Sequence, residues 1–500
     1  MSEAAALPVD RAALGPPERL HPLFLLTGLG KAFKGAWGMI AGGAVLAAQG
    51  YWWTVLALAV GMPLYSLIAL YLRWRRLEYR VGADELRIDS GLLSRTSRAI
   101  PFDRVTDVDL EQGPIHRLFG LARVRFETGA SAGAAAEDGV LDTISLERAE
   151  ALRDFIRARR TGHAVSPTAV LADVPAEVET PVFAMDSKRV LTAGLFNFSL
   201  AVLAGLFGVT QTFGDVLGFD PFKRTFWLMV ADRAGPLRDV IMAHQIVAII
   251  GGAVLLIALG VATGTIRTVL REHGFRLDRT VNGLRRRRGL LTLTDVTIPA
   301  RRVQAAILAT GPIRRRFGWR VLKLQSLAMD GGKGDHVVAP LAHEEEASKV
   351  LHSLDWPIAP AEGNWHRVSR AHVTAFAAMM APAIAVAVVA AILLQPLILI
   401  AILGAGIAIL VRWLEWRRTR FALSDDVLFV ETGWWQQRRR ILPLRKIQSV
   451  DIAESGWSRL FGFCTLRLGV AGGGGFSGHE IPSLPRSGAI DLRHRLLAKA

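Results

Sequence analysis

The sequence contains very little cysteine: Cys464 is the only one among 500 residues. A single cysteine excludes both a disulfide framework within the chain and a cysteine-rich metal site. The signature HExxH, which marks zinc proteases, is also missing, and the 12 histidines are scattered. We therefore expect no metal, no cofactor and no enzymatic activity.

What the chain does contain is apolar residues and positive charge. Hydrophobic residues make up 51% of the sequence, charged residues 21%, and the formal net charge is +16. Such a basic excess suits nucleic acid, anionic lipid or the positive-inside bias of a membrane protein. No helix-turn-helix and no interleaving of aromatic and basic residues accompanies the charge, so we expect no nucleic-acid partner. The composition favours apolar spans that alternate with charged, water-exposed domains.

Six stretches approach the roughly 20 apolar residues that a membrane-spanning helix needs. They come in pairs, at 33–49 and 53–72, at 190–210 and 245–270, and at 373–394 and 396–414. The sequence thus predicts six transmembrane helices in three hairpins, with residues 211–244 as an extracytoplasmic loop in the second. Small residues such as Gly251 and Gly404 suit close helix packing there.

Cations lie at one end of each predicted hairpin. Arg73, Arg75 and Arg76 follow the first hairpin, while Lys188 and Arg189 precede the second. Turns at the opposite ends carry almost no net charge. The positive-inside rule therefore predicts a multi-pass protein of the inner membrane with both termini in the cytoplasm.

The segment after each predicted hairpin repeats the same motifs, and repeats of this kind indicate one structural unit used several times. Glycine precedes proline by 10 residues, and proline precedes phenylalanine by 18, in all three segments. The residues that define the repeats are Gly91, Pro101, Phe119 and Gly120; Gly289, Pro299, Phe317 and Gly318; and Gly433, Pro443, Phe461 and Gly462.

Apolar and polar residues alternate within each repeat, as in half-buried strands, for example over 105–110 and 447–452. A helical stretch ends each repeat. We expect several antiparallel strands followed by one helix, with the repeated proline at a strand end or edge. The phenylalanine is expected in the core, and the glycine after it in a turn.

These features resemble the bacterial pleckstrin-homology-like domain, and three copies after three hairpins resemble the YdbT-type family of bacterial membrane proteins. The resemblance rests on the Gly-Leu-Leu, Ile-Pro-x-x-Arg-Val and Arg-x-Phe-Gly groups of the repeats. It implies membrane attachment and an antiparallel β-barrel with a C-terminal helix in each repeat. It implies no particular activity, since a fold does not determine function. The expected organisation is an N-terminal cytoplasmic segment 1–32, hairpin 33–72, PH-like domain 73–162, linker 163–189, hairpin 190–270, PH-like domain 271–357, linker 358–372, hairpin 373–414 and PH-like domain 415–500.

Cations within the repeats are candidates for contact with an anionic ligand or the lipid surface, to which each contributes on the order of 1 kcal/mol. Pairing with neighbouring acids, or a simple solvated face, is the structural alternative. The candidates are Arg104, Arg285, Arg286, Arg287, Arg288, Arg302, Arg314, Arg315, Arg316, Arg438, Arg439, Arg440 and Lys446.

The sequence favours a membrane-anchored binding or scaffold protein that presents three PH-like modules to anionic lipids of the inner leaflet, to a protein partner or to further copies of itself. A transporter or export accessory for a lipid or peptide is the alternative, although the predicted spans hold almost no ionisable residues. An enzyme acting on membrane lipids is a third possibility.

Overall fold

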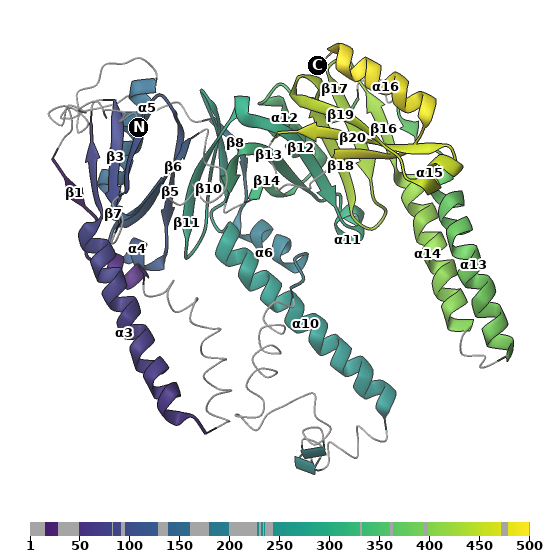
Figure 1. Ribbon diagram of the computed structural model, residues 1–500, viewed down its shortest axis with the longest axis horizontal. Coiled ribbons are helices and arrows are strands. Elements are labelled where there is room, and N and C mark those ends of the chain that lie inside the picture. Colours follow the sequence, from purple (N-terminus) through teal and green to yellow (C-terminus); the bar gives the residue numbers. More distant parts are fainter. Residues whose placement is uncertain are drawn as a thin grey trace, which may run out of the picture. The chain divides into compact units, whose positions relative to one another are not determined.

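The computed structural model describes the chain in two compact units (Figure 1). The first unit comprises residues 1–177, 185–275 and 287–297, and the second comprises 178–184, 276–286 and 298–500. The residues described are 16–28, 50–82, 84–91, 96–128, 139–160, 180–199, 228–229, 232–233, 235, 244–330, 333–360, 364–393, 399–471 and 479–499.

The first unit holds a four-stranded antiparallel sheet and a second group of paired strands. The four-stranded sheet has the order β1 (Glu18–Arg19), β2 (Glu78–Val81), β3 (Glu85–Ser90) and β4 (Thr96–Pro101). The second group has the order β7 (Val140–Ser145), β6 (Leu121–Thr128), β5 (Val105–Gln112) and β11 (Leu293–Pro299). Helix α5 (Leu146–Arg160) packs on this group through Phe155 and Ile156, which join Leu86 and Val124 in one buried core.

The second unit contains a seven-stranded antiparallel sheet and a three-stranded one. The seven strands have the order β14 (Lys333–Ala342), β13 (Arg320–Asp330), β12 (Val303–Thr310), β18 (Gln437–Pro443), β17 (Val427–Thr432), β16 (Arg420–Leu423) and β15 (His366–Arg367). The three have the order β19 (Ile447–Ala453), β20 (Phe463–Val470) and β21 (His479–Pro485), while β8 (Thr180–Ala184) pairs with β9 (Arg276–Thr280) and β10 spans Gly283–Arg288. Helices α12 (Glu344–His352) and α16 (Arg486–Lys499) follow β14 and β21.

Strand pairing joins consecutive repeats in the same way twice. In the first unit β5 pairs with β11, with Gln112 opposite Leu293. In the second unit β12 pairs with β18, with Thr310 opposite Gln437. Counted from the repeated proline of each repeat, Thr310 holds the position of Gln112, and Gln437 that of Leu293. The two joints therefore have the same register.

Fewer helices qualify as membrane spans than the sequence predicts. The long helices are α3 (Trp52–Arg76), α10 (Gln245–Glu272), α13 (Ala371–Leu393) and α14 (Leu399–Arg418). Among the described residues, two helical stretches, Ile250–Glu272 and Ala371–Leu393, are long and apolar enough to cross a membrane. The prediction of six transmembrane helices in three hairpins is therefore wrong as the structure describes the chain, whereas the expected PH-like β-sheets are present.

Local features set where the apolar helices begin and end. The stretch predicted to span 190–210 begins as α6 (Ser187–Leu195), which ends after 9 residues. Helix α3 ends on Arg73, Arg75 and Arg76, and α14 ends on Arg417 and Arg418. Apolar composition by itself does not set where a helix begins and ends, because caps, proline and charge decide this. The predicted span 33–49, residues 200–210 and most of the predicted loop 211–244 lie outside the described residues.

Candidate functional site

One short helix occurs at the same point of every repeat, directly before the repeated phenylalanine and glycine. These helices are α4 (Pro114–Leu118), α11 (Pro312–Arg316) and α15 (Gly456–Leu460). Proline at the first helical position starts α4 and α11, and Ser455 caps α15. Each helix ends before a glycine of positive φ: 63° at Gly120, 73° at Gly318 and 66° at Gly462. Glycine adopts this left-handed conformation without the cost of a Cβ, so it stops the helix after about one turn.

These short helices expose apolar side chains instead of burying them. Leu118 is 79% exposed, Ile313 65% and Leu460 73%. Phe119 and Phe317 are 50% and 59% exposed, so the expectation that they anchor the core is wrong for both. We call the set of α4, α11 and α15 with the residue after each the short-helix rim. Sequence reasoning missed these leucines and isoleucines, since a single helical turn is too short to show an amphipathic period.

Hydrogen bonds place parts of the rim at the ends of the apolar helices. In the second unit, Trp457 Nε1 of α15 donates to the carbonyl of Ala375 in α13 at 3.0 Å, and α15 lies beside the upper end of α13 in Figure 1. In the first unit, the Leu290 amide donates to the Leu270 carbonyl at 3.0 Å near the end of α10. Arg117 of α4 donates to the carbonyl of the same Leu290. Two parts of the rim thus adjoin the two helices that, in the part of the chain that the structure describes, are apolar enough to cross a membrane.

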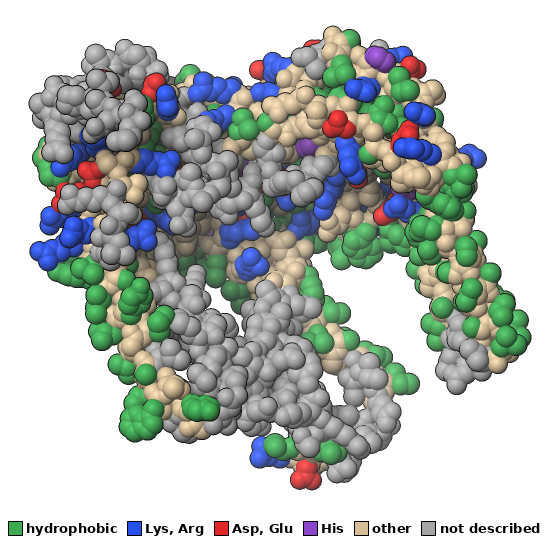
Figure 2. Space-filling model, viewed as in Figure 1, with side chains coloured by type: hydrophobic (Ala, Val, Ile, Leu, Met, Phe, Trp, Pro, Cys, Tyr) green, Lys and Arg blue, Asp and Glu red, His purple; other side chains and the backbone are tan. Residues whose placement is uncertain are grey.

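Charge and apolar surface separate along the second unit. Figure 2 shows green hydrophobic side chains over α13 and α14, and blue Lys and Arg side chains over the strands. On the rim itself, Arg316 is exposed, and the 71% exposed Arg459 side chain lies 3.4 Å from Glu454. Exposed arginines beside exposed leucine and tryptophan are the residue types that contact phospholipid headgroups.

Most of the arginine run in β10 is used inside the protein. Arg286 is 0% exposed, and its Nη1 donates to the Val337 carbonyl at 3.1 Å. Arg285 is 7% exposed. Arg288 lies 2.9 Å from the buried Glu272, and Arg287 lies 3.5 Å from Asp295. Arg287 and Arg288 therefore pair with neighbouring acids, which was the alternative to contact with an anionic ligand or the lipid surface.

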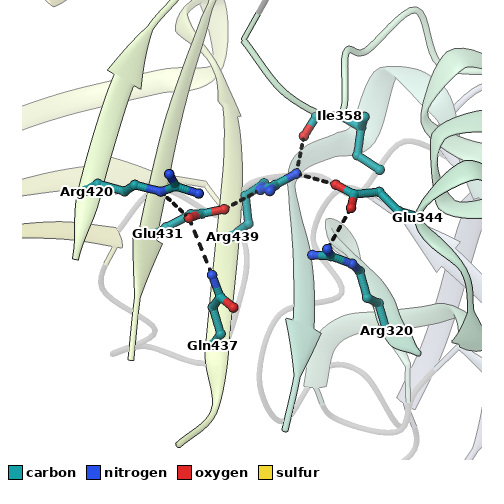
Figure 3. A network of polar contacts seen from close by, with 7 residues as sticks. All are labelled: Arg320, Glu344, Ile358, Arg420, Glu431, Gln437 and Arg439. Carbon is teal, nitrogen blue, oxygen red and sulfur yellow. Dashed lines mark hydrogen bonds and ion pairs between the residues drawn. The ribbon is translucent and has the colours of Figure 1, made fainter. Parts of the chain in front are cut away.

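One arginine of the run in β18, Arg439, belongs to a network of ion pairs in the second unit (Figure 3). Arg439 Nε donates to Glu431 at 2.6 Å, and its Nη1 donates to Glu344 at 2.8 Å. Glu431 also accepts from Arg420 Nε at 2.6 Å, and Glu344 lies 2.6 Å from Arg320. The network connects α12 of the second repeat to strands β16, β17 and β18 of the third.

Electrostatics fix the ionisation state of the central carboxylate. Burial raises the pKa of Glu431, but hydrogen bonds from Arg420 and the charge of Arg439 outweigh it and hold that pKa below its usual value. Glu431, 1% exposed, is thus a carboxylate between two guanidinium groups. A buried charge of this kind is stable only while its partners are present.

The remaining candidate cations lie elsewhere. Arg438 donates to Gln436 at 3.2 Å and Arg440 to Thr432 at 2.9 Å. Lys446 donates to the carbonyl of Arg301 at 2.7 Å. Of the other candidates, Arg104 is exposed, Arg302 is half-buried at the end of a 3-10 turn, and Arg314, Arg315 and Arg316 form the end of α11. The structure therefore brings only Arg314, Arg315 and Arg316 onto the rim.

A buried histidine links the second and third repeats within the same unit. His479 Nε2 lies 2.7 Å from Gln325 Oε1, and we assign the proton to Nε2 because the amide oxygen accepts. Burial, with a contribution from the charge of Arg440, lowers the pKa of His479 to about 4. The imidazole is therefore neutral in the folded protein at neutral pH.

This histidine predicts a pH dependence of stability. An unfolded histidine takes up a proton near pH 6.5, whereas His479 in the folded chain does so only near pH 4. The contribution of His479 to the free energy of unfolding should thus be complete above pH 6.5. As the pH falls from 6.5 to 4, the free energy of unfolding should decrease by up to roughly 1.4 kcal/mol per pH unit. Chemical denaturation of the wild type and of His479→Asn across this range measures it. Equal pH slopes for the two proteins would contradict the prediction.

Metal and thiol chemistry find no support in the described part of the chain. No group of three or more His, Cys, Asp or Glu residues is placed there to hold a metal ion. Cys464 is 0% exposed, and burial raises the pKa of its thiol. A buried, protonated thiol is a poor nucleophile.

Comparison with known proteins supports the repeat architecture. Residues 24–160, 240–355 and 374–500 match the Bacterial PH domain family. The UPF0699 transmembrane protein YdbT of Bacillus subtilis (strain 168) is 26% identical over 334 residues, which cover 63% of this chain and 63% of that protein. The UPF0699 transmembrane protein YdbS of the same organism is 29% identical over 119 residues, 23% of this chain and 71% of that protein. No solved structure matches the chain.

These matches cover most of the sequence, although the chain spans only 63% of the length of YdbT. The transmembrane names of both relatives agree with the two apolar helices, Ile250–Glu272 and Ala371–Leu393, and support a membrane location. The repeated motifs, the antiparallel sheets and the three matched regions lead to one assignment. The chain belongs to the bacterial PH domain family.

Proposed function

We propose that this chain is a non-enzymatic binding protein of the cell membrane, which contacts anionic phospholipid headgroups through the short-helix rim. The observation that carries the proposal is at α15: Trp457 is bonded to the carbonyl of Ala375 in α13, while Leu460 is 73% exposed. If α13 crosses the bilayer, its first turns lie at the headgroup level, and α15 lies there with it.

The rim has the chemistry of an interfacial contact. Burial of apolar surface contributes roughly 25 cal/mol per Å², so a leucine and a tryptophan that are exposed to water are stabilised when they enter the headgroup region. Arg316 and Arg459 add attraction to anionic lipid, on the order of 1 kcal/mol each. A rim helix in every repeat gives several weak contacts on one chain, and linked contacts bind more strongly than separate ones.

The proposal also specifies the side of the membrane on which the repeats lie. From the cation bias of the sequence we propose that the repeats and both termini lie in the cytoplasm, where the anionic lipids of the inner leaflet would face them. The domain boundaries given by the sequence, with PH-like domains at 73–162, 271–357 and 415–500, describe which segments would face that leaflet. In this arrangement the repeats remain free to hold a protein partner on their other surfaces.

The rim can be tested by measuring its depth in a bilayer. The full chain, with Cys464→Ser as background, carries one cysteine at Leu460→Cys and is labelled with a fluorophore in vesicles that contain quencher-bearing lipids. We expect quenching at least about twofold stronger than at a matched control, because an interfacial helix lies about 5–10 Å into the headgroup boundary. Phosphatidylcholine vesicles with and without phosphatidylglycerol separate the apolar from the anionic contribution.

Leu497→Cys provides the control. Leu497 is an exposed leucine of the same repeat, 49% exposed, on α16, which Figure 1 shows at the end of the repeat away from α13 and α14. Equal quenching at positions 460 and 497, or none at 460, would show that the rim does not contact lipid. Quenching at 460 that does not depend on phosphatidylglycerol would limit the contact to its apolar part.

A further inference from the structure

Among the strands that the structure describes, two sheet edges match the edges that pair at the joints between repeats. In the second unit, the three strands β12, β13 and β14 of the second repeat join the four strands β15, β16, β17 and β18 of the third to form the seven-stranded sheet. The third repeat also has a separate three-stranded group, β19-β20-β21, and the first repeat has a separate four-stranded sheet, β1-β2-β3-β4. Among the described strands, β19 and β4 are terminal in their sheets.

From this we propose that copies of this chain associate head to tail, with β19 of one copy pairing antiparallel with β4 of the next. The pairing would reproduce between copies the joint that β12 makes with β18 and that β5 makes with β11 within the chain. Main-chain hydrogen bonds of an added strand supply the affinity, and side-chain register supplies the specificity. Contacts of this heterologous kind extend into a ring or a filament.

Side chains of β19 and β4 are more exposed than the side chains at the same positions of the paired strands β12 and β18. Gln304 and Ala305 of β12 are 5% and 0% exposed, whereas Gln448 and Ser449, at the same positions of β19, are exposed. Ser97 of β4 is exposed, whereas its counterpart in β18, Arg439, is 9% exposed. The positions that are covered at the internal joint are therefore accessible at β19 and β4.

The register of the internal joints predicts which residues would face each other between copies. Ile307 of β12 lies opposite Arg440 of β18. Counted from the repeated prolines, these positions are Asp451 in β19 and Arg98 in β4. A carboxylate would thus lie opposite a guanidinium, and opposite charges across paired strands are favourable where like charges are not. This complementarity favours a second copy of the chain over an unrelated strand as the occupant.

Disulfide trapping between two tagged full-length chains tests the register. One chain carries Asp451→Cys and the other Arg98→Cys, both with Cys464→Ser, and they are co-reconstituted in vesicles and oxidised. We expect a dimer that contains both tags, at a yield about fivefold or more above the pair Gln448→Cys and Arg98→Cys, since a disulfide needs Cα atoms within about 7 Å. Position 448 lies on the same strand but three residues out of register.

Exchange of charge gives an independent test without cysteine. Asp451→Arg and Arg98→Asp should each reduce self-association severalfold, and a mixture of the two proteins should restore it, because every joint in the mixture again places opposite charges together. Co-purification of two tags from purified protein measures this. The proposal would be overturned if trapping gave no dimer, gave dimers with one tag only, or gave equal yields at positions 448 and 451. It would also be overturned if mixing the two charge variants did not restore self-association. Neither test depends on lipid binding by the rim, so the two proposals can fail separately.

Discussion

Replacing Glu431 by glutamine is expected to lower the free energy of unfolding by about 3–5 kcal/mol, the range for a buried ion pair that loses one partner. Two guanidinium groups, of Arg420 and Arg439, each lie 2.6 Å from this carboxylate. The glutamine is nearly the same size, so the loss would come from charge and not from a cavity. Chemical denaturation of the full chain in detergent micelles measures the change.

Glu344→Gln is the matched control. Glu344 also accepts from two arginines, Arg320 at 2.6 Å and Arg439 at 2.8 Å, but its side chain is 41% exposed. Solvent screens such a pair, and its contribution is about 1 kcal/mol or less. Similar losses for the two variants would show that burial does not set the strength of this network.

The Glu431 prediction also has a pH signature. Because the pKa of Glu431 is lowered in the folded chain, its contribution is complete above the ordinary pKa of a glutamate, about 4.3, and is lost as the pH falls below that. In the Glu431→Gln variant, the part of the decrease in the free energy of unfolding at low pH that comes from Glu431 should be absent. The difference between the two acid profiles isolates Glu431 from the other carboxylates.

Alanine at Gly289 is expected to destabilise the fold by about 3 kcal/mol, through backbone strain and a direct clash. Gly289 has φ of 122°, and a Cβ placed there would lie 1.8 Å from the Thr292 carbonyl oxygen. The Gly289 amide also donates to the His273 carbonyl at 2.8 Å, directly after α10. Strain at this turn would therefore disturb the connection between α10 and the β-strands. Thermal unfolding in micelles measures the loss.

The controls for Gly289 come from other glycines of the chain. Gly311 has φ of −95°, and no atom lies within 4 Å of a Cβ placed there, so Gly311→Ala should change the stability by no more than about 0.5 kcal/mol. Gly433 holds the same position in the third repeat, with φ of 86° and a Cβ 2.2 Å from the Gln436 oxygen. Gly433→Ala should thus behave like Gly289→Ala. An effect at Gly289 no larger than that at Gly311 would contradict the prediction.

Much of the local structure could be predicted from the repeats. Alternation over 105–110 and 447–452 marks β5 and β19, because side chains of a strand point to opposite faces in turn. Each repeated proline is the last residue of its strand, and Gly91, Gly289 and Gly433 all have positive φ. These are properties of a few neighbouring residues, so the spacing of a motif is sufficient to indicate them.

The candidate site was predicted less well, because it depends on partners that are distant in the sequence. Arg439 and Arg287 belong to dense cation runs, yet Arg439 pairs with Glu431 and Glu344, and Arg287 with Asp295. The exposed Leu118 and Leu460 look like core residues in the sequence, since apolar character indicates burial only on average.

By itself the sequence determined that one unit is used three times, that its strands alternate, and that the chain has apolar helices and an excess of positive charge, because these are properties of composition and spacing. Only the tertiary structure decided which arginines are buried against acids, which apolar residues remain exposed, and which strands of successive repeats pair. Burial and strand pairing depend on distances between segments far apart in the chain, and no local pattern specifies those distances.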